Sequence, residues 1–257
     1  MKLPTHLLLL ASLLTFMTCQ AADLPAGSAN EVEVGASHDA LDNGYNDWDS
    51  VYLDALHRFA ARHSVYGELR ETQRFNLRDR EISGGYSHPF SDTWTGVVEA
   101  SVSPDHNVLA KNSVFGQLQK SFDDGWGVQA GLRRSEYDTS STELMLLTGE
   151  RYWGNYRGAY TLYLGRPQDA GAASSHLAQF SYYYGERSYL TLGISAGRQV
   201  ESLGPGVGVL VTDVASVSVS GRHWLDSGWG VSYEAILEHQ GDLYTRKGIR
   251  LGLRHAF

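Results

Sequence analysis

The sequence predicts an all-β fold, a transmembrane antiparallel up-and-down β-barrel of about 14 strands. Three observations predict it: segments of roughly ten residues that alternate apolar and polar side chains, tight aromatic-flanked turns that alternate with longer polar loops, and a last strand that ends in Phe257. The composition agrees, because 11% aromatic and 19% charged residues describe a folded chain. The net charge of −8 argues against a nucleic-acid partner.

Residues 1–21 have the pattern of a cleaved signal peptide. Lys2 supplies the positive charge, residues 7–17 form an apolar core too short to span a bilayer, and residues 19–21 form a small-residue cleavage site. We therefore expect export through the Sec pathway. A lipoprotein with its lipid on Cys19 is the less favoured alternative, because the three preceding residues are bulkier than a lipidation motif prefers. Cleavage removes the one cysteine and excludes a disulfide framework.

The mature chain is expected to consist of a short periplasmic leader, residues 22–30, and one barrel domain, residues 31–257. No later stretch is apolar enough for a transmembrane helix, so the choice lies between a soluble periplasmic protein and a membrane barrel. Residues 126–134 and 229–238 alternate apolar with polar or small side chains. The strands of a soluble β-sandwich also alternate apolar and polar side chains, so the turns are needed to distinguish a membrane barrel from a soluble protein.

The expected turns carry aromatic residues on both sides. The pattern Phe-Asp-Asp-Gly-Trp at residues 122–126 recurs at residues 224–229, and Gly and Asn supply the positive φ that short hairpins need. Indole and phenol rings prefer the membrane interface, so these turns predict a periplasmic aromatic girdle. Its expected members are Phe90, Trp94, Phe122, Trp126, Trp153, Tyr156, Tyr184, Tyr189, Trp224 and Trp229.

Longer polar loops alternate with these turns, an asymmetry typical of outer-membrane barrels. The expected strands, in chain order, are residues 31–40, 48–59, 64–75, 80–90, 94–103, 111–122, 126–137, 142–153, 156–166, 175–184, 188–200, 208–225, 229–240 and 244–257. An even number returns both termini to the periplasm. Twelve strands remain an alternative, because the first strand and the overlong segment 208–225 are the weakest assignments.

The alternation also predicts which polar side chains enter the lumen. They either line a water-filled passage or form ion pairs that fill the barrel, and no segment is long enough for a plug domain or a large constriction loop. The expected lumen-lining residues are Glu68, Arg70, Glu99, Gln117, Gln129, Arg133, Arg157, Glu234, Arg250 and Arg254.

The C-terminal residues resemble the insertion signal of outer-membrane barrels, which the barrel-assembly machinery reads. The signal consists of Ile249, Leu251, Leu253 and the terminal Phe257, whereas His255 departs from the usual apolar residue at that position. An ordinary amphipathic edge strand is the alternative.

The chain resembles the YaiO-type outer-membrane β-barrel family from about Val32 to Phe257. The resemblance rests on residues 131–133 with Tyr137, on residues 156–158 after Trp153, and on residues 192–197. These are strand patterns, so the resemblance implies location and architecture and transfers no activity or functional residue.

The candidate catalytic pairs are weak. Ser175-His176 and Asp105-His106 lack a nucleophile motif, and adjacent residues of a strand point to opposite faces. Residues 204–208 suggest a phosphate loop but lack the following Lys and helix, so we interpret them as a turn. We therefore expect no catalytic or cofactor-binding residue.

The first outer loop is acidic. Asp39, Asp42, Asn43, Asp47 and Asp49 offer oxygen ligands for a divalent cation, but their spacing does not match an EF-hand. A solvated loop, or one bridged by cations to lipopolysaccharide, is the favoured interpretation, and no metal site is expected.

These observations together predict a monomeric barrel in the outer membrane of a Gram-negative bacterium, with membrane lipid and lipopolysaccharide as its surroundings. The predicted function is a narrow passive channel for small polar solutes or saccharides. A non-conducting structural or surface-exposed barrel and an outer-membrane enzyme are the alternatives.

Overall fold

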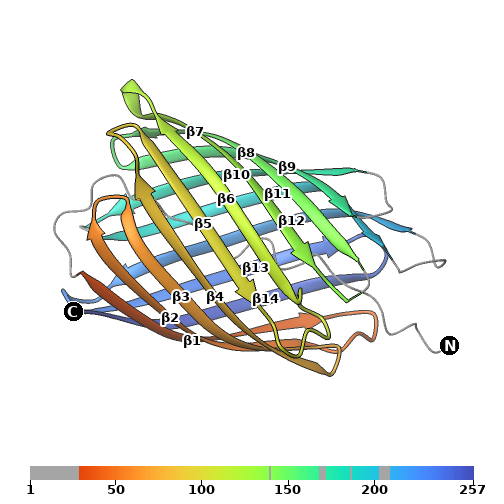
Figure 1. Ribbon diagram of the computed structural model, residues 1–257. Helices are drawn as coiled ribbons and strands as arrows, with labels where there is room; N and C mark the ends of the chain where they lie inside the picture. Colours follow the sequence, from red (N-terminus) through yellow and green to blue (C-terminus); the bar gives the residue numbers. More distant parts are fainter. Residues whose placement is uncertain (1–28, 139, 168–171, 186, 203–208) are drawn as a thin grey trace.

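The computed structural model describes residues 29–138, 140–167, 172–185, 187–202 and 209–257. In these residues the chain forms one closed barrel of fourteen antiparallel strands, in which each strand pairs with its neighbours in sequence and the first strand pairs with the last (Figure 1). The predicted fold class is confirmed, and the twelve-strand alternative is wrong. No helix among these residues is long and apolar enough to cross a membrane.

The strands follow the expected segments closely. They are β1 (Asn30–Leu41), β2 (Trp48–Ala60), β3 (His63–Arg74), β4 (Leu77–Pro89), β5 (Trp94–Val102), β6 (Asn112–Ser121), β7 (Trp126–Glu136), β8 (Ser141–Trp153), β9 (Tyr156–Pro167), β10 (Ala173–Tyr184), β11 (Ser188–Ser202), β12 (Val209–Trp224), β13 (Trp229–Gln240) and β14 (Tyr244–Ala256). The overlong segment is thus a single strand, β12, and a short 3₁₀ turn, η1 (Asp123–Gly125), joins β6 to β7.

The two ends of the barrel differ in their connections. The end that carries the chain termini, which we call the turn rim, joins strands through two to four residues, such as 61–62, 122–125 and 154–155. At this rim the backbone N–H of Asn30 donates to the carbonyl of Phe257. The opposite end, the loop rim, has connections of up to nine residues, 103–111. Short turns face the periplasm in outer-membrane barrels, so the turn rim corresponds to the end that the sequence predicts to be periplasmic.

One connection at the loop rim is as tight as the turns. Residues 75–76 join β3 to β4, and both Phe75 (φ 53°) and Asn76 (φ 64°) lie in the left-handed region. Two consecutive positive φ values give the hairpin turn whose twist matches that of the strands.

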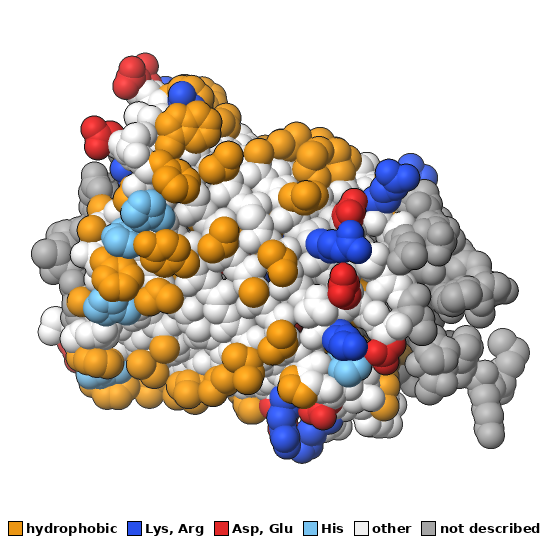
Figure 2. All heavy atoms as spheres, in the orientation of Figure 1, with side chains coloured by type: hydrophobic (Ala, Val, Ile, Leu, Met, Phe, Trp, Pro, Cys, Tyr) orange, Lys and Arg blue, Asp and Glu red, His pale blue; other side chains and the backbone are white. Residues whose placement is uncertain are grey.

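The barrel is inverted relative to a soluble protein, with polar side chains inside and apolar ones outside. Val34, Leu132, Ile194 and Leu251 are among the large apolar side chains exposed on the outer wall. Figure 2 shows such side chains spread over the wall, while Lys, Arg, Asp and Glu lie at its two ends, mostly toward the end opposite the C-terminus. An apolar band of this extent has to face lipid.

Candidate functional site

The candidate site is the barrel interior. All ten residues predicted to enter the lumen lie on the inner face of the wall, because the antiparallel register places every second residue of each strand inside. The inner face divides into two parts. The charged wall comprises β13, β14 and β1 to β4, and the neutral wall comprises β5 to β12.

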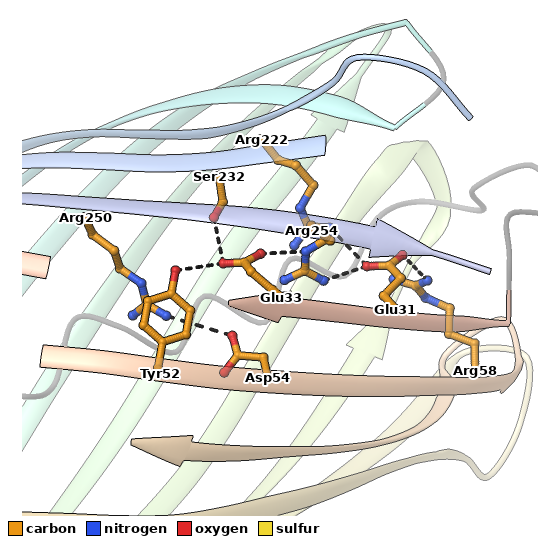
Figure 3. Close-up of polar contacts among 9 residues, drawn as sticks. All are labelled: Glu31, Glu33, Tyr52, Asp54, Arg58, Arg222, Ser232, Arg250 and Arg254. Atoms are coloured by element: carbon orange, nitrogen blue, oxygen red, sulfur yellow. Dashed lines mark hydrogen bonds and ion pairs between the residues drawn. The ribbon is translucent and has the colours of Figure 1, made fainter. Parts of the chain in front are cut away.

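A group of ion pairs, which we call the seam cluster, joins the first strand to the last (Figure 3). Glu31 has a side chain only 1% exposed and accepts from Arg58 (Nη1 to Oε1, 2.5 Å) and from Arg254 (Nη1 to Oε2, 2.6 Å). Arg222 of β12 approaches the same carboxylate at 3.9 Å. Three guanidinium groups from three strands therefore converge on one buried acid.

Glu33 completes the seam cluster. It is paired in register with Arg254, whose Nε donates to Oε2 at 2.6 Å. Its other oxygen accepts from Tyr52 (2.8 Å) and from Ser232 (2.6 Å). Glycine at position 35 leaves room for the Tyr52 side chain to reach Glu33, since a Cβ on Gly35 would lie 2.2 Å from the Tyr52 hydroxyl. Both seam carboxylates are thus fully engaged, as buried charges require.

The charged wall continues from the seam toward the loop rim. Arg70 bonds Glu81 and lies 3.2 Å from Glu68. Arg250 stacks 3.8 Å above the Tyr52 ring and reaches Asp54 at 3.9 Å. Arginines on this wall thus pair with acids of neighbouring strands.

An aromatic cluster covers the charged wall near the loop rim. Trp48 and Tyr244 are each 1% exposed and pack edge to face at 5.9 Å, with Phe75 5.4 Å from Trp48. The guanidinium groups of Arg74 and Arg246 lie 4.7 and 5.5 Å from the Trp48 ring. This cluster fills part of the barrel cross-section on one side.

The neutral wall is built mainly from hydroxyl and amide side chains. Hydroxyl pairs bridge neighbouring strands at 2.7–2.8 Å, and a chain of amides runs from Gln119 through Gln117 and Gln129 to Glu150. Its ion pairs join Glu99 with Arg133 and Glu150 with Arg157, each at 2.7 Å. The hydroxyl pairs are Thr148 with Thr161, Ser181 with Thr191, and Ser195 with Ser216.

A cavity of about 200 Å³ lies between the neutral wall and parts of β3, β4 and β13 of the charged wall. Its lining includes Tyr66, Leu144, Tyr163, Gln179, Thr191 and Ser218. One water needs only about 10–15 Å³, so the cavity has room for several waters or a small solute. The lining also contains charged side chains, namely Arg70, Glu81, Glu99, Arg133, Arg157 and Glu234. The mixture of these groups with hydroxyl, amide, phenol and apolar groups suits a small polar molecule.

The β5–β6 loop folds inward at the loop rim, a feature that the sequence reasoning missed. The carboxylate of Asp79, which is fully buried, accepts from the backbone N–H groups of Asn107, Val108 and Leu109 at 2.7–2.8 Å and from the Asn107 amide at 2.8 Å. Leu109 and Ala110 thereby reach the cavity lining. Two features of the sequence could have indicated this inward loop: the shortness of β5, and the inward acid Asp79, which faces no cation on the paired strand β3.

Eight of the ten predicted girdle residues point outward at the turn rim, but Tyr189 and Trp224 point inward. Trp224 pairs with Gly230 and stacks 3.7 Å from the Arg187 guanidinium. The error lies in aligning the two turns: the residue equivalent to Phe122 is Leu225, whose N–H bonds the carbonyl of Trp229, as that of Phe122 bonds Trp126.

Tyr189 was misplaced for a related reason. The β10–β11 hairpin pairs Tyr184 with Ser188 and Tyr183 with Tyr189. Because paired residues share a face, Tyr189 joins Tyr183 on the inner wall, whereas Tyr184 stays outside. The insertion-signal residues Ile249, Leu251, Leu253 and Phe257 are all exposed.

Neither of the two candidate catalytic pairs forms in the structure. Ser175 faces inward, while His176 faces outward and lies 2.6 Å from the Tyr160 hydroxyl. His106 pairs with Asp138 of the next loop at 2.9 Å instead of with Asp105. Residues 204–208 lie outside the described residues.

The acidic residues of the first outer loop are each held by protein groups. Asp39 lies 3.7 Å from Arg246, Asp42 accepts from the Thr245 N–H, Asp47 accepts from the Leu41 N–H, Asp49 pairs with His38, and the Asn43 amide donates to the Leu243 carbonyl. Over the part of the chain that the structure describes, no three His, Cys, Asp or Glu side chains converge on a metal site.

The apolar exterior, the polar interior and the aromatic rim define a transmembrane β-barrel. Residues 29–202 match the YaiO membrane beta barrel domain, so the chain belongs to this family and is an outer-membrane β-barrel. The comparison with curated protein sequences finds no significant match.

Solved structures with a similar fold share little sequence with this chain. A bacterial polysaccharide outer membrane secretin is 13% identical, with a TM-score of 0.55, over 91% of this chain and 100% of its own. OmpF of Salmonella typhi, in complex with daunomycin, is 10% identical, with a TM-score of 0.51, over 89% and 97%. OmpT of Vibrio cholerae is 12% identical, with a TM-score of 0.50, over 91% and 100%. At these identities the likeness concerns the fold alone.

Proposed function

We propose that the protein is a narrow passive channel for small polar solutes, with neutral saccharides as the favoured class. The observation that carries the proposal is the position of the cavity, which lies beside hydroxyl and amide groups of the neutral wall. Such groups exchange hydrogen bonds with a polyol without the desolvation cost of an unpaired charge.

The charged wall supports the same conclusion. Its acids and arginines bond one another across strands, as in the pairs of Glu33 with Arg254 and of Glu81 with Arg70. A solute that passes along the neutral wall therefore meets little net charge. We expect weak ion selectivity and no saturable catalytic turnover.

A second candidate function is a non-conducting structural barrel. The observations that favour it are the aromatic cluster around Trp48 and the inward β5–β6 loop, since both narrow the interior at the loop rim. Conductance separates the two functions.

The test places the purified full chain in planar bilayers for single-channel recording and in vesicles for swelling with a neutral hexose or a hexuronate. We expect ohmic steps and faster entry of the hexose. Ser218→Trp, on the cavity lining, should reduce both. Val219→Trp is the matched control, because this neighbouring side chain is exposed on the lipid face. A folded barrel that carries no current would support the non-conducting function instead.

A further inference from the structure

The outer surface at the turn rim is rich in histidine. His57, His63, His88, His223 and His255 all point outward there, and we call them the imidazole belt. Figure 2 shows histidine side chains interspersed with apolar ones at this end of the wall. Aromatic rings are sufficient to anchor a barrel rim at the membrane–water interface. The histidine side chains therefore need a different explanation.

The belt is most compact on β2, β3 and β4. The Nε2 of His63 lies 2.8 Å from the Tyr86 hydroxyl, which lies 3.3 Å from the Nδ1 of His88, and the two imidazole rings are 5.0 Å apart. Phe59 (55% exposed) and Phe90 (67% exposed) flank this polar triad, with their rings 4.7 Å from His63 and 5.5 Å from His88. Nitrogen donors framed by exposed rings lie at the depth of lipid headgroups, where polar groups stay hydrated.

The outer face of this rim is also one-sided in charge. Lys120 lies 4.7 Å above the Trp94 ring and Arg151 5.1 Å above the Trp126 ring. Among the described strand residues at this rim, no outward side chain is a carboxylate. The carboxylates near it belong to the turns, such as Asp226 beside His255, and to the terminal residue Phe257. At the loop rim, by contrast, outward cations are paired with acids, as Arg80 is with Glu71 and Arg134 with Glu143.

We propose that the imidazole belt binds the headgroup of an anionic phospholipid in the periplasmic leaflet, with His63 and His88 donating to its phosphate oxygens. Charge complementarity carries the assignment, because the imidazole N–H donors of His63 and His88 and the cations Lys120 and Arg151 meet no outward side-chain carboxylate on the described strands of this rim. The proposal depends on the membrane position of the barrel and not on whether the lumen conducts.

The test compares the full chain in phosphatidylcholine nanodiscs with and without phosphatidylglycerol, at about pH 6. Native mass spectrometry counts bound lipids after release from the disc. The variant is His63→Gln/His88→Gln, which keeps polar side chains and removes both imidazoles. The matched control is His38→Gln/His176→Gln, two outward histidines at the loop rim.

We expect the wild type and the control to retain phosphatidylglycerol in preference to phosphatidylcholine, and the variant to retain on the order of twofold to fivefold less, the range for an exposed ion pair. Equal retention by variant and control, or no headgroup preference in the wild type, would overturn the proposal. Thermal unfolding of the wild type in phosphatidylcholine with added inorganic phosphate is the second arm. Stabilisation by phosphate that equals that by phosphatidylglycerol would overturn the assignment to lipid.

Discussion

Arg254→Met should destabilise the closed barrel by about 3–5 kcal/mol, the range for removing one partner of a buried ion pair. Arg254 donates to Glu31 and to Glu33 at 2.6 Å each, and both carboxylates are almost completely buried. The substitution therefore leaves two acids short of a donor at the seam between β1 and β14. It leaves the outward residues of the insertion signal unchanged, since Arg254 points inward.

Arg80→Met provides the comparison. Arg80 also pairs with a glutamate, Glu71, at 3.1 Å, but its side chain is 69% exposed on the outer face. Exposed pairs contribute about 0–1 kcal/mol. The two substitutions thus remove the same chemical group from a buried and an exposed pair, and the expected difference is about 3 kcal/mol.

The free energy of unfolding is measured by urea titration of the protein folded in vesicles, with tryptophan fluorescence as the signal. Glu33→Met/Arg254→Met, which removes both charges of one pair, should cost less than the sum of its single substitutions. If Arg254→Met and Arg80→Met lose the same free energy within about 1 kcal/mol, the seam cluster does not stabilise closure and the reasoning is wrong.

Three other perturbations test other parts of the molecule. Asp79→Asn removes charged acceptors from the β5–β6 loop and should cost about 2–3 kcal/mol, with faster proteolysis at Lys111 as the readout. Arg133→Glu places a second carboxylate beside Glu99 and should raise cation preference, measured as a reversal potential in a salt gradient. Asp226 accepts backbone N–H bonds from Trp229 and Gly228, which lower the pKa of its carboxyl. A depressed folded pKa stabilises the β12–β13 turn above about pH 4, and this contribution disappears as the pH falls through the folded pKa. Amide exchange at Trp229, measured across that range, should quicken in the wild type and change little in Asp226→Asn.

The architecture could be predicted because its causes are local. Period-two alternation assigns each residue to a face, and tight turns fix where each strand ends, so residues such as Glu68 and Arg133 were placed inside without any contact information. The predictions that Tyr189 and Trp224 face outward are wrong, because the face of each side chain depends on the register of the adjacent turn. One residue of misalignment exchanges inside for outside.

The partners inside the barrel could not be predicted. The pairing of Glu31 with Arg58, Arg222 and Arg254 needs the closure of β1 on β14 and the approach of β12, which join residues more than 190 positions apart. The bonds from Asp79 to the β5–β6 loop likewise depend on how a loop folds across a neighbouring strand. Local patterns contain no information on such contacts.

The two walls of the interior imply separate roles that can be tested together. The charged wall contains the strands that must meet to close the barrel, and its buried pairs hold β1 to β14, whereas the neutral wall supplies most of the cavity lining. A change on the charged wall, such as Arg254→Met, should therefore lower stability with little effect on solute entry into barrels that have folded. A change on the neutral wall, such as Ser218→Trp, should reduce entry while costing less in stability, because the cavity accommodates the added ring. If the first change abolished entry into folded barrels and the second left it unchanged, the permeation path would have to run along the charged wall.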